Sequence, residues 1–354
     1  MKIKTTNREN LIINALRETE EKRALQIPEG YAEIALSSKG KLGAPELFHI
    51  RNFKVGEVMS LAQTKESDLS QRLTSILNEM ILEDVDVKDW HESEVLETMV
   101  YVYMIFFQPI LKDVYFPVNQ EDLNYLESQG RTDEAQYIRE GKQKPLVEIN
   151  IADGVTTYDL PDNFKKTLRI KNPDTGFYCD FSYIKYGDKL VVQEFLDRYF
   201  AEQEARFTDI IQRINYNNNV IRNRKNNPLV KTLPIDPVEE AEYREYRDER
   251  IKMISEVTQY VSIVNYNGRD VSDLPLWEKY KLLSEDPRVD YNMFQILEEK
   301  RGTQEFGIKP LVKMTNPFTK EPCERRLAFR LSVILQAIIF SRSNRYVCSS
   351  SDED

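Results

Sequence analysis

Apolar residues recur at three- and four-residue intervals between residues 67 and 83, which is the spacing of one helix face. The positions are Leu69, Leu73, Ile76, Leu77, Met80 and Ile81. We therefore predict an amphipathic helix over residues 67–83. The following segment, residues 92–108, is apolar around most of its circumference and predicts a central helix, capped by Ser93 and ended near Pro109.

A different period, alternation between apolar and polar residues, marks residues 31–36, and a second strand-like run covers residues 47–53. Gly40, Gly43 and Pro45 lie between the two runs and favour a loop. These features together predict a β-hairpin. Residues 5–25, at the start of the chain, have a helix-forming pattern that ends at the Pro-Glu-Gly sequence before the first strand.

The middle of the chain changes from helical to strand-like patterns. Residues 119–144 are polar and helical in pattern, with breaks at Gly130 and Gly141, so we predict a helical hairpin. Short strand-like runs separated by turn residues then follow. These runs are residues 146–151, 156–160, 167–170, 177–185 and 189–192. Their close spacing predicts an antiparallel meander.

The C-terminal part is mainly helical in pattern. One helix is predicted from residue 193 to about 214, an Asn-rich loop follows, and a long helix starts at Pro237 and runs to about residue 264. Further helical segments cover residues 276–284, 291–300 and 325–340, and we find no internal repeat.

The fold class predicted from these elements is α+β, with amphipathic helices flanking a short-stranded antiparallel β block and a mainly helical C-terminal part. Five units are predicted along the chain. They are residues 1–116, an N-terminal helix, hairpin and packed helical pair; 117–144, an inserted helical hairpin; 145–200, an antiparallel β-rich block; 201–341, a mainly helical domain; and 342–354, a disordered acidic tail.

Composition restricts the functional classes. The chain of 354 residues is 41% hydrophobic and 31% charged, as expected of a globular protein. Its net charge of −10 argues against nonspecific nucleic-acid binding, which needs a concentrated cationic surface. The cysteines, Cys179, Cys323 and Cys348, form no CxxC pair, so we expect neither a disulfide framework nor a cysteine metal site. The apolar runs 99–107 and 327–340 are shorter than the roughly 20 residues that span a bilayer.

Motifs with catalytic potential have simpler structural interpretations. The triplet Asp174-Thr175-Gly176 occurs once and follows Asn-Pro, so a β-turn is favoured over an aspartic-protease site. His49 and His91 lie in no metal-ligand spacing, and phosphate-loop, dinucleotide-binding and nucleophile-elbow motifs are absent from the sequence. We therefore expect a protein that is not an enzyme, with no cofactor and no metal. A metal-dependent hydrolase that uses dispersed carboxylates is a further alternative.

Opposite charges cluster in two neighbouring segments. Residues 213–231 carry five cationic side chains and no acid, whereas residues 236–250 carry seven acids against three arginines. Such blocks suit a contact of the loop with its own helix, a contact with another protein, or, as a weaker alternative, a nucleic-acid contact.

Three segments of the chain resemble the baseplate hub subunit and hub-assembly family of contractile-tailed bacteriophages. The first segment is the strand of residues 48–57 with the helices that follow it. The second is the β block of residues 147–196, in which residues 158–161 precede residues 189–192. The third is the C-terminal part, where residues 268–271 are followed by residues 277–283 and then by residues 316–323. Some members of this family have cysteine pairs that suggest a metal-binding knuckle. This chain has only single cysteines, Cys179 and Cys323, in the corresponding regions, so the resemblance implies no zinc site.

The resemblance implies a structural or assembly component of the tail baseplate hub, located in the virion tail baseplate and assembled in the bacterial host cytoplasm. Its partners would be other baseplate and hub proteins and the tail-tube or tape-measure end, in a multi-subunit assembly without direct nucleic-acid contact or a membrane anchor. Another tail or portal-proximal adaptor is the alternative. The residues that we expect at the structural centre or the partner interface are Arg51, Phe53, Tyr101, Tyr103, Phe106, Phe107, Arg222, Arg224 and Lys225.

Overall fold

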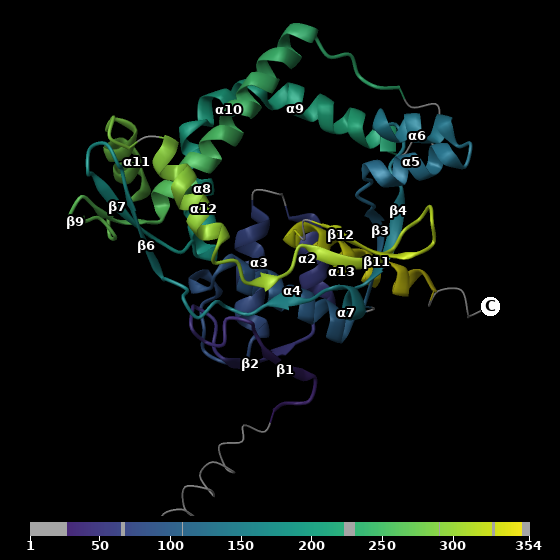
Figure 1. The fold of residues 1–354 in the computed structure, drawn as a ribbon, viewed down its shortest axis with the longest axis horizontal. Helices are drawn as coiled ribbons and strands as arrows, with labels where there is room; N and C mark the ends of the chain where they lie inside the picture. Colours follow the sequence, from purple (N-terminus) through teal and green to yellow (C-terminus); the bar gives the residue numbers. More distant parts are fainter. Residues whose placement is uncertain are drawn as a thin grey trace, which may run out of the picture.

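The computed structural model describes residues 27–64, 68–107, 109–222, 231–289, 291–327 and 330–348, and it has the α+β class predicted from the sequence (Figure 1). The helix predicted over residues 5–25 lies outside the described residues. Buried apolar side chains form two clusters, and we call the parts of the chain around them the first lobe and the second lobe.

The first lobe begins with the elements that periodicity predicted. They are β1 (Tyr31–Ala35), β2 (Leu47–Arg51), α2 (Val55–Gln63), α3 (Leu69–Met80), the short 3₁₀ helix η2 (Val87–Asp89) and α4 (Glu92–Phe106). β1 and β2 pair antiparallel, which confirms the hairpin. The predicted apolar face of α3 is buried through Leu73, Ile76, Leu77 and Met80. His91, rather than the predicted Ser93, caps α4, because the imidazole accepts a hydrogen bond from the Ser93 N–H.

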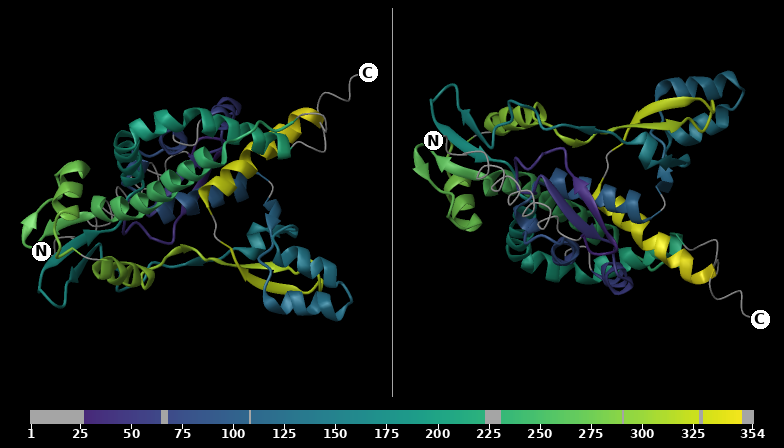
Figure 2. Two further views of the ribbon diagram at one scale, coloured as in Figure 1. Left: turned by 90° about the horizontal axis from the view of Figure 1, so that it is seen from above. Right: turned by 90° about the horizontal axis from the view of Figure 1, so that it is seen from below.

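Segments from both ends of the described chain complete the first lobe. The earlier segments are β3 (Ile110–Tyr115), α5 (Gln120–Ser128), α6 (Thr132–Arg139), β4 (Leu146–Asn150) and α7 (Ile151–Gly154); the later ones are β11 (Leu311–Thr315), β12 (Pro322–Arg326) and α13 (Leu331–Cys348). α5 and α6 confirm the predicted helical hairpin. Figure 2 shows this hairpin beside β11 and β12. The buried side chains of Val312, Ile334 and Ile338 belong to the same cluster as Leu73 and Trp90.

The second lobe is the intervening part of the chain. Its elements are β6 (Thr167–Lys171), β7 (Tyr178–Ser182), α8 (Tyr186–Tyr199), α9 (Ala201–Arg222), α10 (Pro237–Val261), β8 (Ile263–Tyr266), β9 (Arg269–Asp270), α11 (Leu276–Ser284) and α12 (Tyr291–Gly302). The strands form one antiparallel sheet in the order β6-β7-β8-β9. β5 (Thr157–Tyr158) precedes this lobe in the sequence and β10 (Gly307–Ile308) follows it. The two strands pair antiparallel, so the segments that enter and leave the second lobe lie side by side.

The structure corrects three sequence predictions of secondary structure. The predicted meander is divided, because β4 pairs with β3, β5 with β10, and β6 with β7. Residues 189–192 lie within helix α8 instead of a strand, since Val192, Phe195 and Leu196 bury one helical face and Asp188 caps the helix start. The last helix begins at Leu331 rather than near residue 325 and continues to Cys348, because residues 322–326 pair with β11.

Two hairpin turns have the same construction, a short repeat that the sequence analysis missed. Asn172-Pro173 joins β6 to β7, and Asn316-Pro317 joins β11 to β12. In each turn the asparagine Oδ1 accepts from the N–H groups of the second and third residues after it, and a threonine hydroxyl accepts from the N–H of the residue two positions later. The first of these turns contains Asp174-Thr175-Gly176, so the triplet lies in a hairpin turn as predicted; the Gly176 N–H donates to the Asn172 carbonyl at 3.0 Å, which makes the turn one residue longer than a β-turn.

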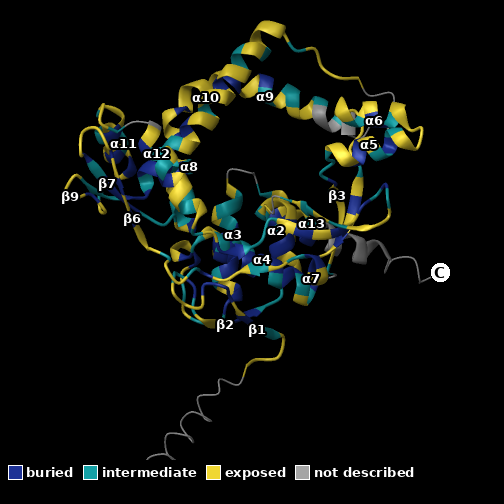
Figure 3. Ribbon diagram, viewed as in Figure 1, coloured by how far each residue is buried: buried dark blue, intermediate teal, exposed yellow. Residues whose placement is uncertain are grey.

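Helices α9 and α10 extend from the second lobe as an arm whose far part is largely exposed (Figure 3). The basic loop predicted to start at Arg213 starts later, because α9 continues to Arg222. The Arg213 guanidinium forms a salt bridge with Asp209 on its own helix, and its Nη2 lies 3.4 Å from Oε2 of Glu239 on α10. At this position the opposite charges of the two segments meet within the chain.

Candidate functional site

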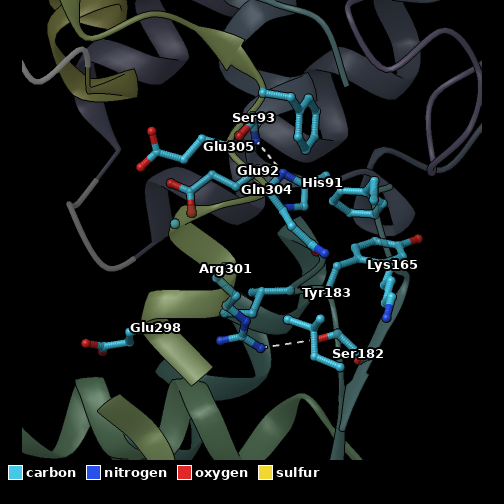
Figure 4. Close-up of a pocket in the computed structure, with 15 residues that line it drawn as sticks. His91, Glu92, Ser93, Lys165, Ser182, Tyr183, Glu298, Arg301, Gln304 and Glu305 are labelled. Carbon is cyan, nitrogen blue, oxygen red and sulfur yellow. Dashed lines mark hydrogen bonds between the residues drawn. The ribbon is translucent and has the colours of Figure 1, made fainter. Parts of the chain in front are cut away.

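A cleft of about 380 Å³ lies where the two lobes meet (Figure 4). Its walls come from the start of α4, from β6 and β7, from the end of α12 and from residues 304–306. The lobes are joined beside it, since the Tyr186 N–H donates to the Trp90 carbonyl at 2.7 Å and Lys185 pairs with Asp89 at 2.8 Å. The cleft therefore has walls contributed by both lobes.

His91 forms an aromatic part of the cleft wall. Its Nδ1 accepts from the Ser93 N–H at 3.0 Å, so the neutral ring carries its proton on Nε2. The ring centroid lies 4.8 Å from that of Phe306 and 6.0 Å from that of Tyr183. Burial lowers the pKa of His91 to about 4; Arg301 and Lys189 act in the same direction, and Glu92 opposes them. The imidazole is therefore neutral at pH 7.

Arg301 lies in the cleft wall, and its guanidinium is hydrogen-bonded to other residues of the protein. Its guanidinium donates to Gln259 Oε1, to the Ser182 carbonyl at 3.1 Å and to Ser262 Oγ at 2.9 Å. Burial lowers its pKa to about 10, an effect that the carboxylates of Glu298 and Asp188 partly offset. These contacts tie α12 to β7 and to the C-terminal end of α10, so Arg301 fixes the shape of the cleft.

The cleft is suited to binding by packing and hydrogen bonding. Aromatic rings line it, with Phe164 and Phe306 in an edge-to-face contact at 6.0 Å. The neutral His91 and the internally bonded Arg301 favour the holding of a group over proton transfer at neutral pH. A cleft of this size and lining accommodates one large side chain or a small planar group.

We predict a pH-dependent contribution of His91 to folding stability. Because its folded pKa of about 4 lies below the ordinary value of 6.5, protonation favours the unfolded chain; the contribution is complete above pH 6.5 and is lost as the pH falls toward 4. Between pH 7 and pH 5 the free energy of unfolding should drop by about 2 kcal/mol from this group alone. Urea unfolding at both pH values measures it.

The variant His91→Asn provides the control, because an asparagine oxygen also caps a helix but does not titrate. The pH-dependent loss should be smaller in this variant by about 2 kcal/mol. An equal loss in both proteins would show that other groups carry the pH dependence.

The structure places the predicted central residues mainly inside the first lobe. Arg51 donates to both carboxylate oxygens of Glu57, at 3.0 and 2.7 Å, and Phe53 is buried. Tyr103 is buried and donates to the Ile110 carbonyl at 3.0 Å. These residues support the start of α2 and the end of α4; their role in contact with a partner stays a prediction.

The remaining predicted residues fall into two groups. Phe107 is buried and stacks on Tyr103, whereas Tyr101 and Phe106 are partly buried, with the Tyr101 hydroxyl 3.3 Å from Glu97. Arg222 ends α9, but its side chain, like all of Arg224 and Lys225, lies outside what the structure describes.

Sequence reasoning missed two buried glutamates on α4, which was predicted to be apolar around most of its surface. Glu97 accepts from the Ser37 N–H and hydroxyl, the latter at 2.6 Å, and Glu94 accepts from the Ala44 N–H at 3.2 Å. Burial raises the pKa of Glu97, and its hydrogen bonds oppose that rise. The two carboxylates hold the β1–β2 loop against α4.

A second missed feature is an exposed aromatic patch on α8 and α11, which we define as Phe195, Tyr199, Trp277 and Tyr280. The Trp277 side chain is 56% exposed and Tyr199 is 36% exposed. Phe195 is buried beneath them, and its ring centroid lies 5.4 Å from Trp277 and 5.1 Å from Tyr280. Because α8 and α11 are distant in sequence, periodicity within either helix did not indicate the patch.

Among the residues that the structure describes, no group of three or more His, Cys, Asp or Glu side chains is placed to hold a metal ion. Among the same residues, no helix has both the length and the apolar character required to cross a bilayer. Comparison with protein-family models, curated proteins and solved structures finds no match to this chain.

Proposed function

We propose that this protein is a structural or assembly component of a bacteriophage tail baseplate hub and acts by protein–protein docking. The observation that carries docking is the aromatic patch, which exposes a tryptophan and a tyrosine side by side. Tryptophan and tyrosine dominate the energetics of interface centres, and contiguous exposed apolar surface is typical of interaction sites. The assignment to a baseplate hub rests on the resemblance of residues 48–57, the β block and the C-terminal part.

The proposed partners are other baseplate and hub proteins and the tail-tube or tape-measure end. The aromatic patch supplies a rigid contact surface, because its rings pack on one another between α8 and α11. The cleft between the lobes offers a second, concave contact for a single side chain. Both are shape-based contacts, which agrees with a protein that assembles rather than catalyses.

The proposal predicts that the purified chain forms a stable complex with at least one hub protein in size-exclusion chromatography. Trp277→Ala should weaken that complex by about tenfold or more, because truncation of a central tryptophan commonly costs about 2 kcal/mol. Val333→Ala, which truncates a different exposed apolar side chain on α13, is the control and should bind as the parent protein does.

Mass spectrometry of purified tails and of assembly intermediates gives a second readout. A fixed low ratio to tube and hub proteins supports a built-in component, and presence only in intermediates supports an assembly factor. If the chain is absent from both and binds no hub protein, the baseplate proposal is wrong; a complex with portal proteins alone would favour the adaptor alternative.

A further inference from the structure

Arginine side chains in this protein repeatedly occupy one kind of setting, in which the guanidinium lies over an aromatic ring and also binds a carboxylate. Arg169 lies 4.4 Å from the Tyr178 ring centre and binds Asp180 at 2.7 Å. Arg288 lies 4.7 Å from the Phe177 ring and binds Asp286 at 2.7 Å. The ring attracts the cation through its negative face, and the carboxylate fixes its orientation.

The same combination recurs in both lobes. Arg325 lies 5.4 Å from the Phe116 ring and binds Asp122 at 3.0 Å. Arg250 lies 6.0 Å from the Phe200 ring and binds Asp197 at 2.7 Å. The pairing of ring and carboxylate is therefore one recurring way in which this chain holds a guanidinium.

The aromatic patch offers exposed aromatic rings with carboxylates nearby, which are the two groups that hold the guanidinium at Arg169, Arg288, Arg325 and Arg250. Glu256 lies one helical turn before Tyr260 on α10, on the side of that helix where Tyr260 meets Tyr280 of α11. Tyr260 and Tyr280 lie together, with ring centroids 6.0 Å apart. Glu278, beside Trp277 in sequence, is exposed and adds a second acid on α11.

Two of the cations near the patch are engaged elsewhere. Lys279, between Glu278 and Tyr280, is buried and donates to the carbonyls of Val261 at 3.2 Å and Ile263 at 2.8 Å. Arg198 on α8 pairs with Glu194. Within the described residues, the Lys and Arg contacts to aromatic rings involve none of Tyr199, Trp277 and Tyr280.

We propose that the aromatic patch is a docking site for an arginine side chain carried by an extended segment of a partner protein. The guanidinium stacks on the exposed rings and binds Glu256, which completes the arrangement found at Arg169, Arg288, Arg325 and Arg250. Arginine fits better than lysine because its planar group both stacks on a ring and forks onto a carboxylate. This inference rests on the proposed docking function and names the chemistry of the partner.

The two tryptophans allow a direct test, because Trp90 is buried and Trp277 is exposed. Their indole N–H signals in ¹⁵N-labelled protein are assigned with Trp277→Phe and followed during titration with hexaarginine amide. The Trp277 signal should shift and saturate while the Trp90 signal stays fixed. Hexalysine amide, which has the same charge, should bind more weakly; equal shifts with both peptides would overturn the assignment to arginine.

Matched variants separate the patch from general attraction to an acidic protein. Glu256→Gln should weaken hexaarginine binding by about threefold to fivefold, and Tyr280→Leu by a similar factor. Glu148→Gln removes the same charge from an exposed position on β4 and should leave binding unchanged. Equal weakening by both glutamate variants, or no Trp277 shift at all, would overturn the proposal.

Two further outcomes distinguish this inference from the proposed function. If Trp277→Ala abolishes a hub complex while hexaarginine causes no shift, docking stands and the arginine chemistry fails. If the Trp277 signal moves with protein concentration in the absence of peptide, the patch binds a second copy of this chain, which also overturns the arginine proposal.

Discussion

Replacement of Asp122 by alanine is expected to lower the free energy of unfolding by about 3–5 kcal/mol, the cost typical of leaving a buried charge without its partner. Asp122 is 3% exposed and accepts from Arg325 Nη2 at 3.0 and 3.1 Å and from Asn316 Nδ2 at 2.6 Å. It also accepts from the Asn119 N–H at the start of α5. The substitution therefore removes a helix cap and leaves a guanidinium beside Phe116 without its anion.

Urea unfolding followed by circular dichroism measures this effect. The double variant Asp122→Asn with Arg325→Met should lose less stability than the sum of its single variants, because no buried charge remains. Glu194→Ala, which breaks the exposed pair with Arg198, is the control and should be indistinguishable from the parent. A loss below about 1 kcal/mol for Asp122→Ala would mean that water replaces the lost contacts at little cost.

The second large effect is expected at Gly43, where alanine should cost about 3 kcal/mol of folding stability. A Cβ at this position would lie 2.1 Å from the Asp89 carbonyl oxygen and 2.6 Å from the Trp90 Cα. Both atoms belong to the backbone and cannot rotate away. The β1–β2 loop would have to retreat from Trp90, which is buried against Phe48 with ring centroids 5.1 Å apart.

Gly56→Ala is the matched control for this prediction. Gly56 lies in the first turn of α2, and a Cβ there meets no atom within 4 Å. Alanine should be neutral or stabilise the protein by up to about 1 kcal/mol, because it reduces the freedom of the unfolded chain. Thermal unfolding of the two variants should thus shift in opposite directions, and a similar shift in both would contradict the close approach at Gly43.

Elements defined by local pattern were predicted well from the sequence. The hairpin of β1 and β2, the helices α3, α4 and α10, and the α5–α6 hairpin each depend on a period or a turn within one segment. Lys189–Val192 was misassigned because a short run rich in β-branched residues is ambiguous by period alone. There the burial of Val192 and Phe195 on one helical face decided the structure.

Features assembled from distant segments were not predicted. β5 and β10 are separated by the whole second lobe in sequence, and no local pattern indicates their pairing. The cleft and the aromatic patch likewise combine residues that only the tertiary fold brings together. Glu94 and Glu97 were missed because a helix sequence does not reveal which of its polar residues will meet unpaired loop N–H groups.

The discontinuous first lobe has a consequence for synthesis on the ribosome. Residues 27–160 emerge early, yet their core includes Val312, Ile334, Leu335 and Ile338, which are translated after the whole second lobe. The second lobe has all its strands and helices as soon as residue 302 has emerged. We therefore expect the nascent chain to complete the later-encoded lobe first, while the earlier one keeps apolar surface available to chaperones until its final segment is released.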